Sequence, residues 1–230
     1  MKKFSLTGGW KKLKSDMANM TWKERFVHLW TYYKVWLLVG LLVVMGLSLV
    51  ITAVVNKNTT TLASGMLVNV ELSEEGSYYL KDALFEELKQ GGWEKVQLNQ
   101  ATMGDLGKAE FAETNYYTII SLTGLAVEGE LDYVIMNKRG MEGLVPQEIF
   151  LDLREVLTEQ ELEALGTKVL HARPAEGVEN IPTVVDITDL PFIQQNVKLE
   201  EDDVIYFGFA KKSDRPENYR LIWDRINNWE

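Results

Sequence analysis

The segment from Val35 to Val55 constrains the fold most, because its 21 consecutive residues carry no charge. A helix of that length reaches about 31 Å at about 1.5 Å per residue, which matches a hydrocarbon core of about 30 Å. Buried helices of globular proteins rarely stay apolar on every face for so long. A cleaved signal peptide would have a shorter apolar region nearer the N-terminus and a small-residue cleavage site after it. The sequence therefore predicts an uncleaved transmembrane helix over residues 35–55.

The charges on the two sides of this segment predict its orientation. Eight basic and two acidic residues precede it, a net charge of +6, whereas 16 basic and 32 acidic residues follow it, a net charge of −16. The positive-inside rule places the N-terminus in the cytoplasm and the large C-terminal part outside. We therefore expect a single-pass protein of the cell membrane, with the lipid bilayer as one partner. Nucleic acid is not an expected partner, because the acidic part has no basic stripe to neutralise phosphates.

Residues 1–34 are expected to form a basic cytoplasmic leader with one amphipathic helix. Large apolar residues recur on one helical face: Trp22, Phe26, Leu29, Trp30 and Tyr33. Thr21 and Glu24 match a capping box at the start of this helix. Such a helix would lie in the inner-leaflet interface, with its basic residues near anionic headgroups, or dock a membrane protein partner. The two roles can coexist.

The sequence predicts a short polar stalk over residues 56–64 and an extracytoplasmic α/β domain over residues 65–230. We expect strands at 66–72, 94–98, 131–136, 183–187 and 204–210, and helices at 75–90, 112–128, 141–145, 159–165 and 215–229. This alternation predicts a mainly parallel, three-layer α/β domain with helices on both faces of the sheet. The most apolar strand, 204–210, should be central, and Asp132 should mark the entry of a parallel neighbour. The chain has no cysteine, so this domain must be stable through its core alone.

Four segments of this domain carry a resemblance to a known family: 129–136 (GELDYVIM), 150–154 (FLDLR), 185–192 (VDITDLPF) and 207–219 (FGFAKKSDRPENY). They resemble the extracytoplasmic solute-binding proteins of ABC importers, which have the type II periplasmic-binding-protein fold. The resemblance implies that residues 65–230 form one lobe of such a protein, with the Val35–Val55 segment replacing the family's lipid-attachment cysteine. The leader is also similar to that of short membrane-anchored proteins of low-GC Gram-positive bacteria.

No enzyme signature is visible in the sequence, which lacks a G-x-S-x-G elbow, a P-loop and an H-E-x-x-H motif. We therefore expect a protein that is not an enzyme and that holds no metal and no cofactor. A small ligand would sit outside the carboxyl ends of the strands. The candidate ligand-binding residues there are Ser73, Asn99, Asn137, Lys138 and Arg139. Lys138 and Arg139 would suit an anion, but ordinary helix capping and loop solvation explain these residues more simply.

These observations favour a membrane-anchored extracytoplasmic module that binds a partner or a small ligand, as an accessory of a transport or envelope complex. The alternative is a transmembrane sensor or adaptor that relays binding outside the cell to the cytoplasmic helix. A hydrolase is the third and least favoured hypothesis, because no catalytic constellation supports it.

Overall fold

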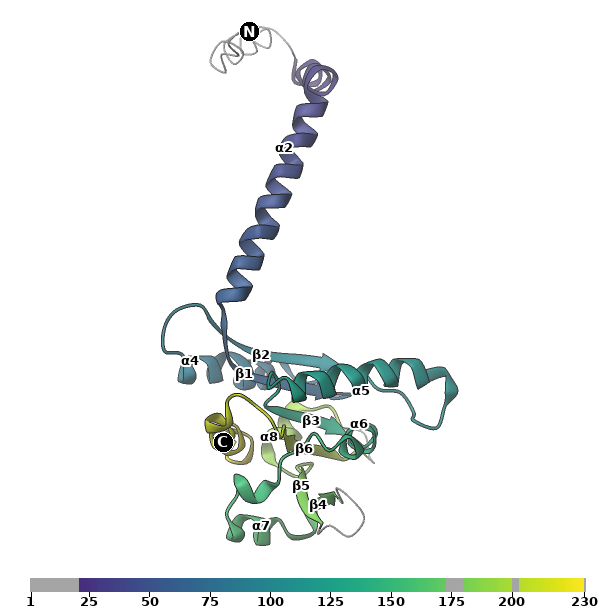
Figure 1. Cartoon of the computed structure of the whole chain (residues 1–230), viewed down its shortest axis with the longest axis vertical. Coiled ribbons are helices and arrows are strands. Elements are labelled where there is room, and N and C mark those ends of the chain that lie inside the picture. Colours follow the sequence, from purple (N-terminus) through teal and green to yellow (C-terminus); the bar gives the residue numbers. More distant parts are fainter. Residues whose placement is uncertain (1–20, 173–179, 200–202, 230) are drawn as a thin grey trace. The chain divides into compact units, whose positions relative to one another are not determined.

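The structure is a computed structural model that describes residues 21–172, 180–199 and 203–229 (Figure 1). The chain divides into two compact units, residues 1–58 and residues 59–230. We describe each unit by itself.

The described part of the first unit, residues 21–58, forms a continuous helix, α2 (Trp22–Asn58). The leader helix and the transmembrane helix, expected as two elements, are therefore one element. Its stretch Lys34–Val55 is long and apolar enough to cross a membrane. The predicted capping box is confirmed, because Thr21 N donates to Glu24 Oε2 at 2.8 Å and Glu24 N donates to Thr21 Oγ1 at 3.5 Å. At the other end, Asn58 Nδ2 donates to the Val54 carbonyl oxygen at 2.7 Å.

The second unit is a mixed α/β domain built on a six-stranded sheet with the order β2-β1-β3-β6-β5-β4. The strands are β1 (Thr60–Val68), β2 (Glu94–Ala101), β3 (Tyr133–Asn137), β4 (Val169–Ala172), β5 (Ile181–Asp186) and β6 (Ile205–Phe209). Strand β1 is parallel to β2 and β3, whereas the β3–β6, β6–β5 and β5–β4 pairs are antiparallel. The expectation of a mainly parallel sheet is therefore wrong. Strand β6 is central as predicted, but its neighbour β3 runs antiparallel to it.

Helix α8 (Pro191–Asn196) lies in the connection from β5 to β6. A parallel neighbour requires a crossover that carries the chain back along the whole strand. This connection instead returns the chain to the sheet near the end at which it left, and β6 runs antiparallel to β5.

The other helices of the domain are α3 (Glu74–Tyr78), α4 (Leu84–Leu88), α5 (Ala112–Val127), α6 (Lys138–Leu144), α7 (Glu159–Leu165) and α9 (Tyr219–Asn227). A π-helical turn, η1 (Tyr79–Ala83), joins α3 to α4 within the predicted helix 75–90. Short 3-10 turns are η2 (Ala109–Phe111), η3 (Val145–Gln147), η4 (Leu153–Glu155), η5 (Gly166–Lys168) and η6 (Pro216–Asn218). The sequence analysis missed β4 and α8.

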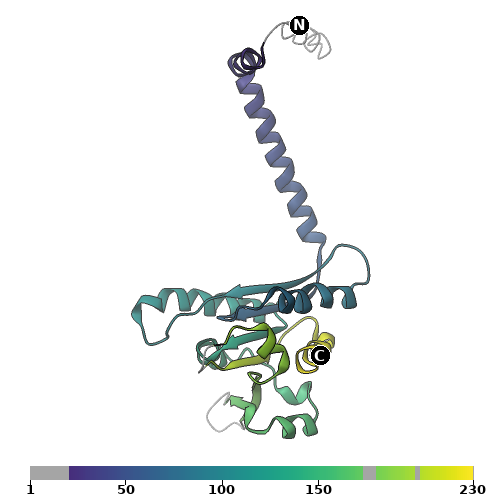
Figure 2. The ribbon, with the colours of Figure 1, turned by 180° about the vertical axis from the view of Figure 1, so that it is seen from behind.

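Alternate residues of the central strands enter two separate hydrophobic clusters. In β3, Tyr133 and Ile135 join the cluster that also contains residues of α4, α8 and α9, whereas Val134 and Met136 join the cluster that contains residues of α5 and α6. Figures 1 and 2 show α5 lying along strands β1 and β2. All five residues of β6 are buried, which agrees with its central position.

The structure corrects the prediction of a polar stalk, because residues 60–64 form the first part of strand β1. Thr60 pairs with Glu94 of β2, and the side chains of Ala63 and Ser64 are buried. The polar composition suggested a solvated linker, but threonine is β-branched and favours strands once a partner strand is available. Only Thr59 separates the end of α2 from the start of β1.

Candidate functional site

The predicted ligand edge contains Asn137, which ends β3 and caps α6. Its Oδ1 atom accepts hydrogen bonds from Gly140 N and from Asn69 Nδ2, both at 3.2 Å. Asn69 in turn pairs with the backbone of Met103, donating to its carbonyl oxygen and accepting from its N–H, both at 2.8 Å. The Asn137 side-chain oxygen and both polar atoms of the Asn69 side chain are thus engaged by the chain itself. The sequence analysis missed Asn69, whose φ of 55° follows from the tolerance of asparagine for left-handed backbone.

Lys138 and Arg139 follow Asn137 as the exposed first residues of α6. The Gly107 N–H lowers the pKa of the nearby Asp105 carboxyl by donating a hydrogen bond to it, and the charges of Lys108 and Arg139 act in the same direction. The positive charge of Arg139 therefore already has a carboxylate near it. This reduces its capacity to attract a further anion.

Ser73 and Asn99 do not join Asn137 in one hydrogen-bonded group. Ser73 caps α3 by accepting from Gly76 N at 3.0 Å and donates to Asn196 Oδ1 of α8 at 2.7 Å. Helix α8 packs in the cluster with α9, whereas α6 packs in the opposite one. Asn99 is exposed opposite Met66, before the end of β2. A ligand role for the five candidate residues therefore stays a prediction.

The leader residues predicted to face lipid or a partner all lie in α2. Trp22 and Trp30 are exposed. The side chains of Phe26, Leu29 and Tyr33 lie outside the described part of the structure.

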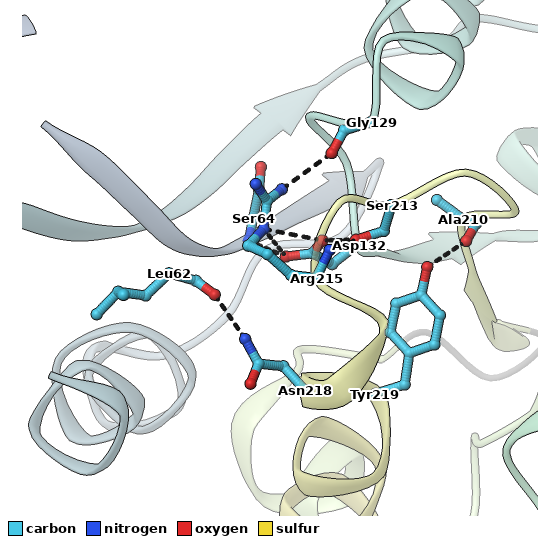
Figure 3. Close-up of polar contacts among 9 residues, drawn as sticks. All are labelled: Leu62, Ser64, Gly129, Asp132, Ala210, Ser213, Arg215, Asn218 and Tyr219. Carbon is cyan, nitrogen blue, oxygen red and sulfur yellow. Dashed lines mark hydrogen bonds and ion pairs between the residues drawn. The ribbon is translucent and has the colours of Figure 1, made fainter. Parts of the chain in front are cut away.

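A buried carboxylate directly before β3 is surrounded by hydrogen-bond donors (Figure 3). The Asp132 side chain is fully buried, and its Oδ2 atom accepts from Ser64 N at 2.7 Å. The Arg215 Nε atom lies 3.0 Å from the same oxygen and 3.1 Å from Oδ1, which also accepts from the Ser213 hydroxyl. Arg215 Nη2 donates to the Gly129 carbonyl oxygen at 3.3 Å. We call these five residues the Asp132 network.

The Asp132 network connects the loop before α9 to strands β1 and β3. Asn218 adds a bond to the Leu62 carbonyl oxygen at 2.8 Å, and the Tyr219 hydroxyl donates to the Ala210 carbonyl oxygen. Burial raises the pKa of Asp132, and hydrogen bonds from Arg215 and Ser213 oppose that rise. Burial also raises the pKa of Tyr219 to about 12. Because both carboxylate oxygens face donors from the chain itself, we interpret this network as structural.

The Asp132 network includes residues from two of the four segments that carry the solute-binding resemblance. Gly129 and Asp132 belong to one quoted segment and Arg215 to another, and the structure brings all three into contact. Asp214 N also donates to the Gly129 carbonyl oxygen, at 3.1 Å. In this chain the two segments therefore share a structural task, the attachment of α9 to the sheet.

Chemical catalysis finds little support among the described residues. No group of three His, Asp or Glu side chains there could hold a metal ion. A cavity of about 300 Å³ lies beside the network, at the lower limit for a small-molecule site. Its lining consists of Leu151, Glu155, Val156, Lys211, Pro216, Tyr219 and Arg220. Arg220 is already engaged by Glu161 at 2.7 Å and by Asp224 at 3.0 Å.

Helix α5 presents large apolar side chains to solvent. Four of them lie outside the core: Tyr116 (61% exposed), Tyr117 (62%), Ile120 (51%) and Val127 (56%). We call these four residues the α5 surface. Leu122 and Ala126 of the same helix are buried. The sequence predicted this helix but not its exposed residues, because its apolar residues surround the helix and mark no single face.

Comparison of the chain with protein-family models, with curated proteins and with solved structures finds no match. The resemblance to solute-binding proteins therefore rests on the quoted segments alone. Any functional assignment depends on the geometry described above.

Proposed function

We propose that this chain is a non-enzymatic, single-pass membrane protein whose extracytoplasmic, three-layer α/β domain binds a protein partner. In this proposal the domain is related to one lobe of a solute-binding protein, and α2 anchors it in the membrane. The observation that carries the binding role is the α5 surface. Tyrosine is enriched at protein interfaces because it offers a large apolar area and a polar tip. The rings of Tyr116 and Tyr117 lie 5.8 Å apart, and exposed apolar side chains that gather in this way are typical of interaction sites.

The charges around the α5 surface indicate the chemistry of the partner. The exposed carboxylates of Glu113 and Glu128 lie near the two ends of the helix. Pairing with a second copy through this helix would bring carboxylates together in either orientation, which is unfavourable. A partner with an apolar groove and a basic rim fits better. An accessory of a transport or envelope complex would find such a partner in the outer segment of another membrane protein.

Capture of partners from native membranes by the full chain tests this proposal. The variant Tyr116→Ser/Ile120→Ser removes two members of the α5 surface. The matched control is Tyr78→Ser, because Tyr78 is 59% exposed but lies on α3. We expect the double variant to lose the membrane proteins that the wild type and the control both capture. Identical capture by all three proteins would contradict a binding role for the α5 surface.

The orientation in the membrane is tested separately. Protease added to intact protoplasts should remove residues 59–230 and leave the leader, because the positive-inside rule places the basic leader in the cytoplasm. Protection of the α/β domain from protease would overturn the proposed topology.

The sensor or adaptor hypothesis is favoured by one observation, the single residue Thr59 between α2 and β1. A sensor would need the leader helix to recognise a cytoplasmic partner by shape. The variant Phe26→Leu/Trp30→Leu keeps that face apolar but changes its shape, so it should lose the partner only if the leader docks a protein. Unchanged capture would leave the interfacial interpretation of the leader and remove the support that the sequence of the leader gives to a sensor.

A further inference from the structure

The turn between α4 and β2 presents one large aromatic side chain. Trp93 is 54% exposed and follows two glycines with left-handed backbone, Gly91 (φ 109°) and Gly92 (φ 114°). The Glu94 carboxylate stabilises the turn, because its Oε2 atom accepts from Gln90 N at 3.0 Å and from Gly91 N at 3.1 Å. The exposed indole of Trp93 therefore extends from a turn whose backbone is held by hydrogen bonds to the Glu94 carboxylate.

The backbone connects this turn to the point where the domain begins. Thr60 N donates to the Trp93 carbonyl oxygen at 2.8 Å, and Thr60 pairs with Glu94 in the β1–β2 ladder. Thr60 is also the second residue after the end of α2, and the apolar stretch of α2 ends at Val55. Trp93 is thus bonded to the first strand residue that follows the candidate membrane span.

Chain length limits how far this point can lie from the hydrocarbon core. Residues 56–58 are helical and advance about 1.5 Å each. The two following steps to Thr60 advance at most about 3.6 Å each, so Thr60 lies within about 12 Å of Val55. The interfacial layer on each side of the hydrocarbon core is about 5–8 Å thick. With Val55 at the edge of the hydrocarbon core, the turn with Trp93 is therefore short enough in its connection to reach the headgroup layer.

We infer that Trp93 is a second membrane contact, with its indole in the phospholipid headgroup layer on the outer side. This inference deepens the proposed function and rests on the insertion of α2 that it includes. Tryptophan prefers this layer because its ring is apolar and its N–H can still donate a hydrogen bond. A second contact would restrict rotation of the α/β domain about the junction at Thr59. The membrane would then hold the domain in a preferred orientation toward a neighbouring protein.

The absence of cysteine permits a direct test in the full chain. Gln90→Cys introduces a single site on the turn for a nitroxide spin label, and Thr114→Cys introduces a control site on α5, where both native residues are exposed. The chain is reconstituted in vesicles of phosphatidylcholine and phosphatidylglycerol. Collision rates of the label with oxygen, which concentrates in lipid, and with a water-soluble nickel chelate then report its depth. Each site is measured with Trp93 present and with Trp93→Ser.

We expect a higher ratio of oxygen to nickel collisions at position 90 than at position 114. Trp93→Ser should lower the ratio at position 90 to that of position 114 and leave position 114 unchanged. A label at position 90 that is as exposed to water as the control would overturn the inference. So would a ratio at position 90 that does not respond to Trp93→Ser.

Flotation of the same vesicles distinguishes failure of the Trp93 contact from failure of α2 to insert into the membrane. A chain that floats with the vesicles and resists alkaline extraction is inserted, so a water-exposed label then contradicts only the role of Trp93. A chain that does not float contradicts both the proposed anchor and the inference that rests on it.

Discussion

Helices α9 and α5 use their apolar residues in opposite ways. Helix α9 buries all four of its large apolar residues that face the sheet: Tyr219, Ile222, Trp223 and Ile226. Its outer side carries charged residues such as Arg220 and Asp224. Helix α5 buries Leu122 and Ala126 but leaves the α5 surface in solvent. Folding accounts for the composition of α9, whereas the exposed residues of α5 contribute little to the stability of the domain.

The largest expected difference comes from one charge placed in the core beneath α9 and another placed on the exposed surface of α5. Phe207 is fully buried, and its ring centroid lies 5.7 Å from that of Trp223 of α9. An unpaired buried charge costs several kcal/mol, which is of the order of the stability of a whole domain. Phe207→Asp should therefore abolish cooperative thermal unfolding followed by circular dichroism. Ile120→Asp on the α5 surface should melt like the wild type, and a cooperatively melting Phe207→Asp protein would contradict this account of the core.

Disruption of the Asp132 network, which attaches α9 to the sheet, should cause the next largest loss in the free energy of unfolding. Asp132→Asn leaves the Arg215 guanidinium, whose side chain is only 15% exposed, without its carboxylate. Removal of one partner of a buried ion pair lowers the free energy of unfolding by about 3–5 kcal/mol. Urea denaturation should show this loss. The double variant Asp132→Asn/Arg215→Met should lose less than the sum of the single variants, and additivity would contradict coupling between the two residues.

A smaller contribution to the attachment of α9 depends on pH. Hydrogen bonds from Arg220 and then from the Thr158 backbone lower the pKa of Glu161 to about 2. Its folded pKa lies below its unfolded pKa, so its contribution to stability is present above about pH 4.5 and is lost as pH falls toward 2. The stability difference between wild type and Glu161→Gln should therefore shrink over that range. The comparison with Glu161→Gln is needed because Asp132, whose pKa is raised, contributes with the opposite sign.

The smallest expected effect on stability is on the α5 surface itself. Tyr117→Ser removes an exposed ring, so its effect on the free energy of unfolding should stay within about 0.5 kcal/mol. Urea denaturation of the variant and of the wild type checks this value. Partner capture should nevertheless fall, because a truncated interface tyrosine leaves its pocket unfilled. A large loss of stability would show that Tyr117 belongs to the core and would remove the contrast with α9.

Much of the local structure could be predicted from the sequence, because it depends on neighbouring residues. Helix α7 has its predicted bounds, and a Thr158–Glu161 capping box begins it. The apolar run at β6 correctly indicated a central strand. Strand direction could not be predicted, because it depends on the end of the sheet at which each connection returns the chain. The polar residues 60–64 were assigned to a stalk, because only pairing with the distant β2 makes them a strand.

The Asp132 network could not be found from the sequence, because its members are far apart in the chain. Glycine, aspartate and arginine at residues 129, 132 and 215 are common in solvated loops, and only the folded sheet brings them together. The sequence failed to identify the exposed residues of α5 for a different reason. A helix that is apolar on all sides does not reveal which side the core covers.

The contacts of Asp132 also determine when the domain can complete its fold during synthesis. Its bond to Ser64 joins residues 68 positions apart, and its bonds to Arg215 join residues 83 positions apart. The central strand β6 and the partner Arg215 leave the ribosome long after β1 and β3. Until then β3 has no neighbour on one side, and the carboxylate of Asp132 has no counter-ion. A nascent domain of this kind folds slowly and late, and its exposed strand edges need protection from aggregation in the meantime.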